Sequence, residues 1–188
     1  IFNLVDSGTN KLTQKDIMDQ FEFYGTEFNS EVTHEYSMLS MSGLSKDLNT
    51  SVTQACQLLR EATYPATIVK QELDKERSEL QSLVGNAHAL SDRIFREISL
   101  GGTPYSYPVT GKLHDLGTYT PEALRARMDY FLNKVKKRIY LTGPKSILSV
   151  EKIFKDHCQL LGHEGDFVRT ISYKKHKNEQ PQIVFVPV

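Results

Sequence analysis

The side chains best suited to binding a metal ion lie far apart in this 188-residue sequence. The candidates are His34 with Glu35, His114, and the group formed by His157, Cys158 and His163. Zinc sites are built from His, Cys and carboxylate ligands that recur at short characteristic spacings. None of these candidates combines such a spacing with a fourth partner, so none of them predicts a zinc site.

Two other catalytic motifs do not occur in the sequence. No serine stands in a G-x-S-x-G turn, so a serine nucleophile of that kind is not predicted. The stretch 101–111, GGTPYSYPVTG, lacks the pattern G-x-x-x-x-G-K-[ST] of a phosphate-binding loop. Its three glycines and two prolines instead predict a long ordered loop.

The sequence contains two cysteines, Cys56 and Cys158, which fall in different predicted helices. They form no paired motif of the kind that marks a disulfide framework or a metal site. We therefore expect two buried free thiols.

The charged residues balance, with 23 Lys and Arg against 23 Asp and Glu. Binding to nucleic acid or to an anionic membrane favours an excess of positive charge, so neither partner is expected. The basic run 134–138, KVKKR, follows the end of a predicted helix, where cations interact favourably with the helix dipole. No stretch contains the roughly 20 apolar residues needed to cross a bilayer.

Hydrophobic periodicity and capping residues divide the chain into helices and strands. Residues 26–44 alternate between polar and apolar side chains around a polar break near 33–35, which predicts two antiparallel strands. In the helix that starts near Thr13, we expect Ile17, Met18 and Phe21 to face inward. Helices are predicted at the very start of the chain and over 13–25, 45–64, 68–100, 120–135 and 149–161, and short strands over 137–142 and 183–186.

This order of elements, a hairpin followed by several helices, predicts an α+β fold with an antiparallel sheet and helices packed on one face. A length of 188 residues suits one domain, so we expect residues 1–188 to form a single domain. Because the chain opens without Met at Ile1, inside a predicted helix, we also expect it to be truncated on its N-terminal side.

Seven short phrases follow one another in a fixed order along residues 1 to about 160. They are SGT at 7–9, FYGTEFNSEV at 23–32, SMSGL at 40–44, KQELDKERSEL at 70–80, GGTPYSYPVTG at 101–111, YTPEALRARMDYF at 119–131 and RIYLTGP at 138–144. Each phrase alone is a weak signal, but their order and spacing resemble a domain of the pitrilysin/insulinase family of zinc metalloendopeptidases. That family includes the mitochondrial processing peptidases and the core proteins of the respiratory cytochrome complex.

Active members of this family bind zinc through the inverted motif H-x-x-E-H, whose Glu is the general base, and through a distant Glu on an acidic helix. A Gly-Thr pair follows the second His, and Gly8 with Thr9 matches that pair. The resemblance then implies that Phe2 occupies the general-base position and Asn3 the second-His position. It also implies that Glu79 occupies the third-ligand position.

These two N-terminal substitutions remove the chemistry of the implied site. Phe2 cannot accept a proton from water, and the amide oxygen of Asn3 is a poor ligand for zinc. We therefore expect no catalytic residue, no bound metal and no cofactor in this segment.

The acidic helix keeps the family pattern better, with Glu79 at the third-ligand position and Glu72, one heptad earlier, at a second acidic position. Glu79 cannot hold a metal ion alone. The simpler interpretation is a solvated helix carboxylate close to Lys75 and Arg77, since most carboxylates on helices are exposed.

The family builds its peptidases from paired copies of this domain, one of which carries zinc. The resemblance implies that this chain is the non-catalytic copy. It would help to enclose a peptide substrate in a chamber, together with a zinc-bearing catalytic domain in the same chain or in a second subunit.

Two alternatives remain open at this point. The chain could be a structural or assembly subunit without proteolysis, as the respiratory core proteins are. It could also be an active peptidase with its motif elsewhere, but none of the six histidines begins or ends H-x-x-E-H. Either strand of the hairpin could offer an edge to an extended peptide, although pairing within the domain is the simpler interpretation.

Overall fold

The computed structural model describes residues 1–144, 151–158 and 183, and these residues fall into two compact units. Unit 1 comprises Ile1–Glu31, Ser37–Val69 and the described part of Tyr119–Phe167. Unit 2 comprises Val32–Tyr36, Lys70–Thr118 and Ile183. The single domain expected over residues 1–188 stays a prediction.

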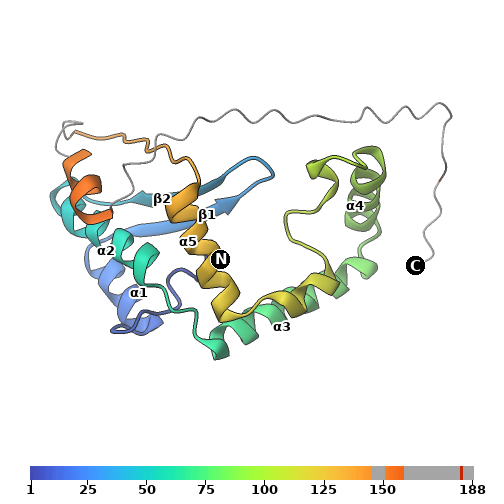
Figure 1. Ribbon diagram of the computed structural model, residues 1–188, viewed down its shortest axis with the longest axis horizontal. Helices are drawn as coiled ribbons and strands as arrows, with labels where there is room; N and C mark the ends of the chain where they lie inside the picture. Colours follow the sequence, from blue (N-terminus) through green and yellow to red (C-terminus); the bar gives the residue numbers. More distant parts are fainter. Residues whose placement is uncertain (145–150, 159–182, 184–188) are drawn as a thin grey trace. The chain divides into compact units, whose positions relative to one another are not determined.

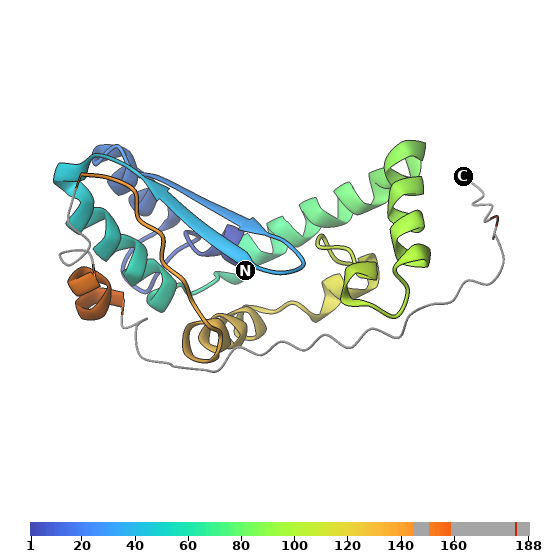
Figure 2. The ribbon, with the colours of Figure 1, turned by 90° about the horizontal axis from the view of Figure 1, so that it is seen from above.

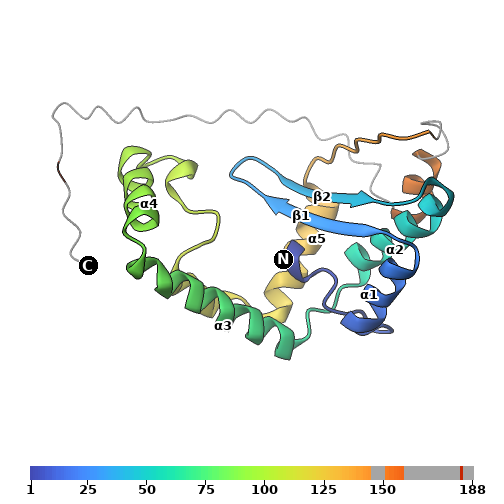
Figure 3. The same cartoon turned by 180° about the vertical axis from the view of Figure 1, so that it is seen from behind.

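Unit 1 contains a β-hairpin with helices on one side of it (Figure 1). Strand β1 spans Glu27–Val32 and pairs with β2, Ser37–Ser42, which confirms the predicted hairpin and its break. The helices of this unit are η1 (Phe2–Leu4), α1 (Gln14–Phe23), η2 (Ser45–Asp47), α2 (Leu48–Glu61) and α5 (Pro121–Lys134). In Figures 1 and 3, α1 and α2 lie on the same side of the strands, so the predicted α+β arrangement is confirmed.

Helix α1 begins where its capping residues predict. The Thr13 hydroxyl accepts a hydrogen bond from the Asp16 backbone at 3.3 Å, and the Asp16 carboxylate accepts one from the Thr13 backbone at 2.9 Å. Ile17 and Phe21 are buried as expected, but Met18 is 49% exposed, so the prediction for Met18 is wrong. The inward stripe of this short helix is narrow because it is set by residues four apart, and Met18 lies beside it.

The start of the chain differs from its prediction, because Phe2–Leu4 forms a single 3-10 turn rather than the end of an α-helix. Val5 and Ser7 are buried immediately after this turn. An isolated antiparallel bridge then joins Gly8 to Thr13 and leads the chain into α1.

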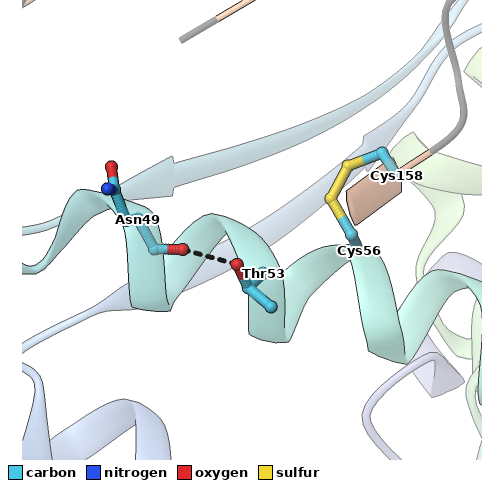
Figure 4. The surroundings of a disulfide bond; sticks show 4 residues. All are labelled: Asn49, Thr53, Cys56 and Cys158. Carbon is cyan, nitrogen blue, oxygen red and sulfur yellow. Dashed lines mark hydrogen bonds between the residues drawn. A yellow bond between two sulfur atoms is a disulfide. The ribbon is translucent and has the colours of Figure 1, made fainter. Parts of the chain in front are cut away.

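The two cysteines are joined, so the expectation of free thiols is wrong. Cys56 on α2 and Cys158 form a disulfide across 102 residues, with their Cα atoms 4.7 Å apart (Figure 4). The pair was not predicted because no spacing rule in the sequence relates two cysteines this far apart. The bond lies in a buried cluster with Val52 and Ile153, against which Met41, Leu48 and Phe154 pack.

Unit 2 is built around the C-terminal part of α3 (Ala66–Ser82), followed by η3 (Leu83–Gly85) and α4 (Ala87–Ser99). A single helix over 68–100 was predicted, but α3 and α4 are separate helices, which follow one another in the green part of the ribbon in Figure 2. The break falls at Gly85 and Asn86, where the Asn86 side chain accepts a hydrogen bond from the Ala89 backbone and caps α4. Asn is a good N-cap and a poor helix interior residue, and Gly lowers helix propensity further. After α4 come η4 (Pro104–Ser106) and η5 (Leu113–Thr118).

Helix α5 matches its prediction at both ends. Thr120 caps it by accepting a hydrogen bond from the Ala123 backbone at 3.2 Å, and Pro121 occupies the first position. At the other end the Lys137 ammonium donates to the carbonyls of Phe131, Leu132 and Val135. The predicted role of the basic run at a helix end is therefore confirmed for Lys137.

The remaining elements agree less well with their predictions. No strand forms over 137–142, because the Lys137 side chain binds the end of α5 and no neighbouring strand pairs with these residues in the described part of the chain. Residues 151–153 are α-helical and Phe154–Cys158 forms a π-helical turn, while the rest of the helix predicted over 149–161 lies outside the described residues. Of the strand predicted over 183–186, only Ile183 is described, and it has no regular structure. None of the described helices has the length and apolar character that a membrane span requires.

Candidate functional site

The position that the family resemblance assigns to the general base is occupied by an aromatic ring in an aromatic cluster of unit 1. The Phe2 ring lies 5.3 Å from the Phe131 ring of α5, at an interplanar angle of 49°. The guanidinium group of Arg127 covers Phe131 at 5.1 Å and Tyr130 at 5.2 Å. Phe2 therefore packs against α5, and it offers no group that could move a proton.

Asn3, at the position implied for the second His, is exposed and bound to the hairpin. Its amide oxygen accepts a hydrogen bond of 2.6 Å from the Ser30 hydroxyl on β1. The oxygen that would have to face a metal ion is thus engaged within the protein. The geometry gives Asn3 a role in fixing the N-terminal segment to β1.

The SGT phrase that sets the register forms a turn rather than a ligand site. The Gly8 carbonyl accepts hydrogen bonds from the Thr63 backbone at 3.0 Å and from the Thr63 hydroxyl at 3.2 Å. The Thr9 hydroxyl accepts from the backbones of Lys11 and Leu12 at 3.2 Å and 3.0 Å. The bonds from Thr63 connect the N-terminal segment to the linker between α2 and α3, and the bonds to Thr9 close the turn itself.

Glu79 lies on the exposed surface of α3, within unit 2. Glu72, Glu76 and Glu79 follow one another at helical spacing along this element. Burial raises the pKa of Glu76, and the neighbouring carboxylates of Glu79 and Glu72 raise it further. This acidic stripe is consistent with the acidic helix of the family. Carboxylates at this helical spacing repel one another when no cation lies between them.

The cations expected beside Glu79 have other partners. Lys75 pairs with Glu72 at 3.6 Å, and Arg77 pairs with Asp74 at 3.0 Å. Both pairs are three residues apart, which is a favourable helical spacing. Glu79 is a solvated carboxylate as predicted, without the predicted cation neighbours at ion-pair distance.

The residues at the three implied positions do not fit a zinc ion. A hydrocarbon ring at Phe2 and an engaged amide at Asn3 leave only the Glu79 carboxylate as a good donor, and zinc sites need three or four. Among the described residues, no group of three or more His, Cys, Asp or Glu side chains could hold a metal ion. The assignment of Phe2, Asn3 and Glu79 to family positions stays a prediction.

The histidines set aside in the sequence have structural partners where they are described. His34 lies at the tip of the hairpin, and its ring nitrogen is 2.9 Å from the Tyr107 carbonyl. His114 lies beside Asp115 at 3.4 Å. Cys158 is in the disulfide, and His163 lies outside the described residues.

In unit 2 a polar network that no sequence motif predicted joins the hairpin tip to the 101–111 loop. Tyr105 donates a hydrogen bond of 2.6 Å to Glu35, and its ring lies 5.6 Å from that of His34. Tyr107 donates to Asp115. These partners are about 70 residues apart or lie in an irregular loop, so no local signal in the sequence could have revealed them.

Unit 1 also buries two hydroxyl groups near the SGT turn. Tyr64 is fully buried with a φ of 52°, and Ser7 is 2% exposed. Neither hydroxyl has a hydrogen-bond partner among the described residues. Burial raises the pKa of Tyr64 to about 12. The nearby Arg125 donates to the Ala62 carbonyl at 3.2 Å and pairs with Asp129 at 2.6 Å.

Comparison with solved structures gives matches for this fold in 47 chains. One of them is the crystal structure of a peptidase M16 inactive domain from Pseudomonas fluorescens, with a TM-score of 0.63 and 16% sequence identity. The match covers 67% of this chain but 31% of that one, so this chain spans about a third of its length. At this identity the likeness establishes the fold. No curated protein matches the chain.

The sequence also matches a family described as Insulinase (Peptidase family M16). The match extends over residues 3–101, which is just over half of the 188 residues and includes parts of both units. It contains the SGT turn, the hairpin, α2, α3 and α4. The family resemblance is therefore confirmed, and the chain belongs to the insulinase family of peptidases, peptidase family M16.

Proposed function

We propose that this chain is a non-catalytic domain of a zinc metalloendopeptidase, and that it helps to form the substrate chamber with a zinc-bearing partner domain. The observation that carries this proposal is the environment of Phe2 and Asn3. Phe2 packs on Phe131, and the Asn3 amide oxygen is bound by Ser30. Side chains committed in this way can neither activate water nor hold zinc.

Two comparisons support the proposal. The chain belongs to a peptidase family, so a peptide is the substrate class that its fold has been used to bind. The structural neighbour from Pseudomonas fluorescens is itself named an inactive domain, and it has the same fold. A non-catalytic copy of this fold therefore has a precedent.

In this proposal the partner domain supplies the metal and the chemistry, and this chain supplies a wall of the chamber. The neighbour is about three times as long as the matched region, which leaves room for a further domain in a protein of that kind. The partner can belong to the same polypeptide or to a second subunit. Neither arrangement requires an ionisable group at Phe2.

The test measures zinc and cleavage in the same samples. The full chain is purified without chelators, its zinc content is measured by elemental analysis, and cleavage of a quenched fluorescent peptide is followed. We expect no stoichiometric zinc and no cleavage. Glu79→Gln is the matched variant, and its zinc content should equal that of the unaltered chain because Glu79 alone does not hold the metal.

A second measurement adds the chain to a separately produced zinc-bearing domain of the same family. An increase in cleavage rate above that of the zinc-bearing domain alone would support a shared chamber. A stable complex without any change in rate would favour the alternative role in assembly. One zinc per chain together with cleavage by the chain alone would overturn the proposal and the register that assigns Phe2 and Asn3 to the degenerate site.

A further inference from the structure

The Cys56–Cys158 disulfide has the setting of a structural bond. The Cα atoms are 4.7 Å apart, within the range of about 4.4–6.8 Å that a disulfide allows. The two cysteines are 2% and 3% exposed. They lie in an apolar cluster with Val52 and Ile153 rather than at the surface.

The bond joins a short helical segment to α2. Residues 151–158 consist of a three-residue α-helical stretch and the π-helical turn Phe154–Cys158. Helices this short are marginal without tertiary contacts, and π-helical turns are rare. Among the residues of this segment whose side chains the structure describes, Ile153 and Cys158 are buried and Phe154 packs against their cluster, so these three residues and the disulfide attach the segment to α2.

We propose that the Cys56–Cys158 disulfide is a lock, formed during folding in an oxidising compartment, that fixes residues 151–158 onto α2. The two thiols lose two protons and two electrons as the S–S bond forms. The two electrons and two protons pass to a disulfide-bearing oxidant: an oxidoreductase becomes its dithiol form, or oxidised glutathione becomes two molecules of reduced glutathione. One cysteine thiolate attacks the disulfide of the oxidant and forms a mixed disulfide, and the thiolate of the second cysteine then attacks the first cysteine's sulfur, which forms the Cys56–Cys158 bond and releases the reduced oxidant.

Burial makes this bond a permanent lock rather than a reversible switch. A reductant must bring its thiolate in line with one of the sulfur atoms, and the side chains of the cluster cover both of them. Reduction therefore requires that residues 151–158 first detach from α2. Persistent structural disulfides are typical of the periplasm, the endoplasmic reticulum and the extracellular space, which places the folding of this chain in a compartment of that class.

The first experiment compares the same full chain produced in the reducing cytosol and in the oxidising periplasm of a bacterial host. Free thiols are alkylated under denaturing conditions, and the peptides are mapped by mass spectrometry without reduction. The periplasmic chain should yield one linked peptide that contains Cys56 and Cys158 and is two hydrogens lighter than the separate peptides. In native buffer the bond should resist dithiothreitol, and it should be reduced once urea is added.

The second experiment tests the attachment of the segment by limited trypsin digestion. Lys152 and Lys155 are exposed and lie inside residues 151–158. Cleavage at these sites should be faster in the cytosolic reduced chain and in the variant Cys56→Ala/Cys158→Ala than in the oxidised chain. Cleavage at Arg96, exposed on α4 in unit 2, is the control and should not change.

Two results would overturn the proposal. The first is that the periplasmic chain has both cysteines alkylated, or has a disulfide between two chains. Either observation would show that the intramolecular lock does not form. The second is that trypsin cleaves at Lys152 and Lys155 at the same rate with and without the disulfide. That result would show that the disulfide does not hold the segment on α2. The reduced unaltered chain gives this second readout even if the alanine variant fails to fold.

Discussion

At the scale of single residues, Tyr64 combines two features that oppose its stability. Its φ of 52° lies in the left-handed region, which is unfavourable for a residue with a bulky side chain. Its buried hydroxyl has no hydrogen-bond partner among the described residues. The ring itself is fully buried in unit 1, and this apolar burial offsets part of both costs.

The first prediction concerns Tyr64→Phe, which keeps the ring and removes the unpaired hydroxyl. An unsatisfied buried hydroxyl costs about 1–3 kcal/mol, so we expect the free energy of unfolding to rise by about 1 kcal/mol. Urea unfolding followed by circular dichroism measures this change. The control is Tyr130→Phe on α5, whose half-exposed ring should give a change within about 0.5 kcal/mol. A clear loss of stability in Tyr64→Phe would mean that the hydroxyl has a partner after all.

The second prediction follows from the pKa of Tyr64, which burial raises from its ordinary 10.0 to about 12. Between these values the unfolded chain loses the phenol proton while the folded chain keeps it. The stability that this group contributes is therefore complete below pH 10 and is lost as the pH rises toward 12. Urea unfolding at about pH 9 and about pH 11.5 should show a steeper alkaline loss in the unaltered chain than in Tyr64→Phe. Identical alkaline slopes would show that Tyr64 titrates as an exposed tyrosine does.

At the scale of elements, the sequence predicts best where the cause of an element is local. The capping box of Thr13 and Asp16, the Thr120 cap and the polar break in the hairpin are each encoded within a few residues, and the structure confirms all three. The strand predicted over 137–142 does not form. A strand needs a neighbouring strand to pair with, and the sequence of the segment itself cannot supply that neighbour.

The break between α3 and α4 has a local cause in the sequence, but the helical period of the apolar residues continues across it. Six apolar residues over 68–100 keep a helical period, whereas two residues, Gly85 and Asn86, end one helix and cap the next. Capping residues decide the outcome because each unpaired backbone group at a helix end needs a partner. Periodicity indicates which residues share a face, and it does not show that the helix is continuous.

The third prediction compares two glycines of unit 2 that have equally open surroundings. An added Cβ meets nothing within 4 Å at Gly85 or at Gly102, but Gly102 has a φ of 77° and Gly85 lies outside the left-handed region. Gly85→Ala should therefore stabilise the chain by about 0.5–1 kcal/mol, and Gly102→Ala should destabilise it by more than about 1 kcal/mol. Urea unfolding of both variants measures the difference. Effects of the same sign would show that space rather than backbone conformation controls these positions.

At the scale of the whole molecule, the sequence predicted the family and the α+β class, because the order of many weak phrases is a global property. The surroundings of the implied site could not be predicted. Phe2 meets Phe131 and Asn3 meets Ser30 across 129 and 27 residues, and neither contact has a sequence signature. The disulfide over 102 residues was missed for the same reason. Long-range pairs are decided by packing, and a single sequence carries no record of which residues pack together.

The distribution of buried side chains carries the last prediction. Every buried hydrophobic residue in the described part of the chain belongs to unit 1, except Leu116. Unit 2 instead exposes Val84, Phe95, Ile98, Leu100, Tyr107, Val109 and Leu113. Because apolar burial is the main source of stability, unit 2 should open at lower free energy than unit 1.

Native-state hydrogen exchange with mass spectrometry can measure this difference. The amides of α4, in unit 2, should exchange before those of α2 and α5, in unit 1. Helix α3 provides an internal control, since Val69 is buried at its start and the rest of the helix has no buried side chain. Protection should therefore fall along α3 from Val69 toward Ser82. Equal protection of the amides in α2 and α4 would mean that the chain opens as one cooperative unit. In that case, states in which only unit 2 is open would be no more populated than the globally unfolded state.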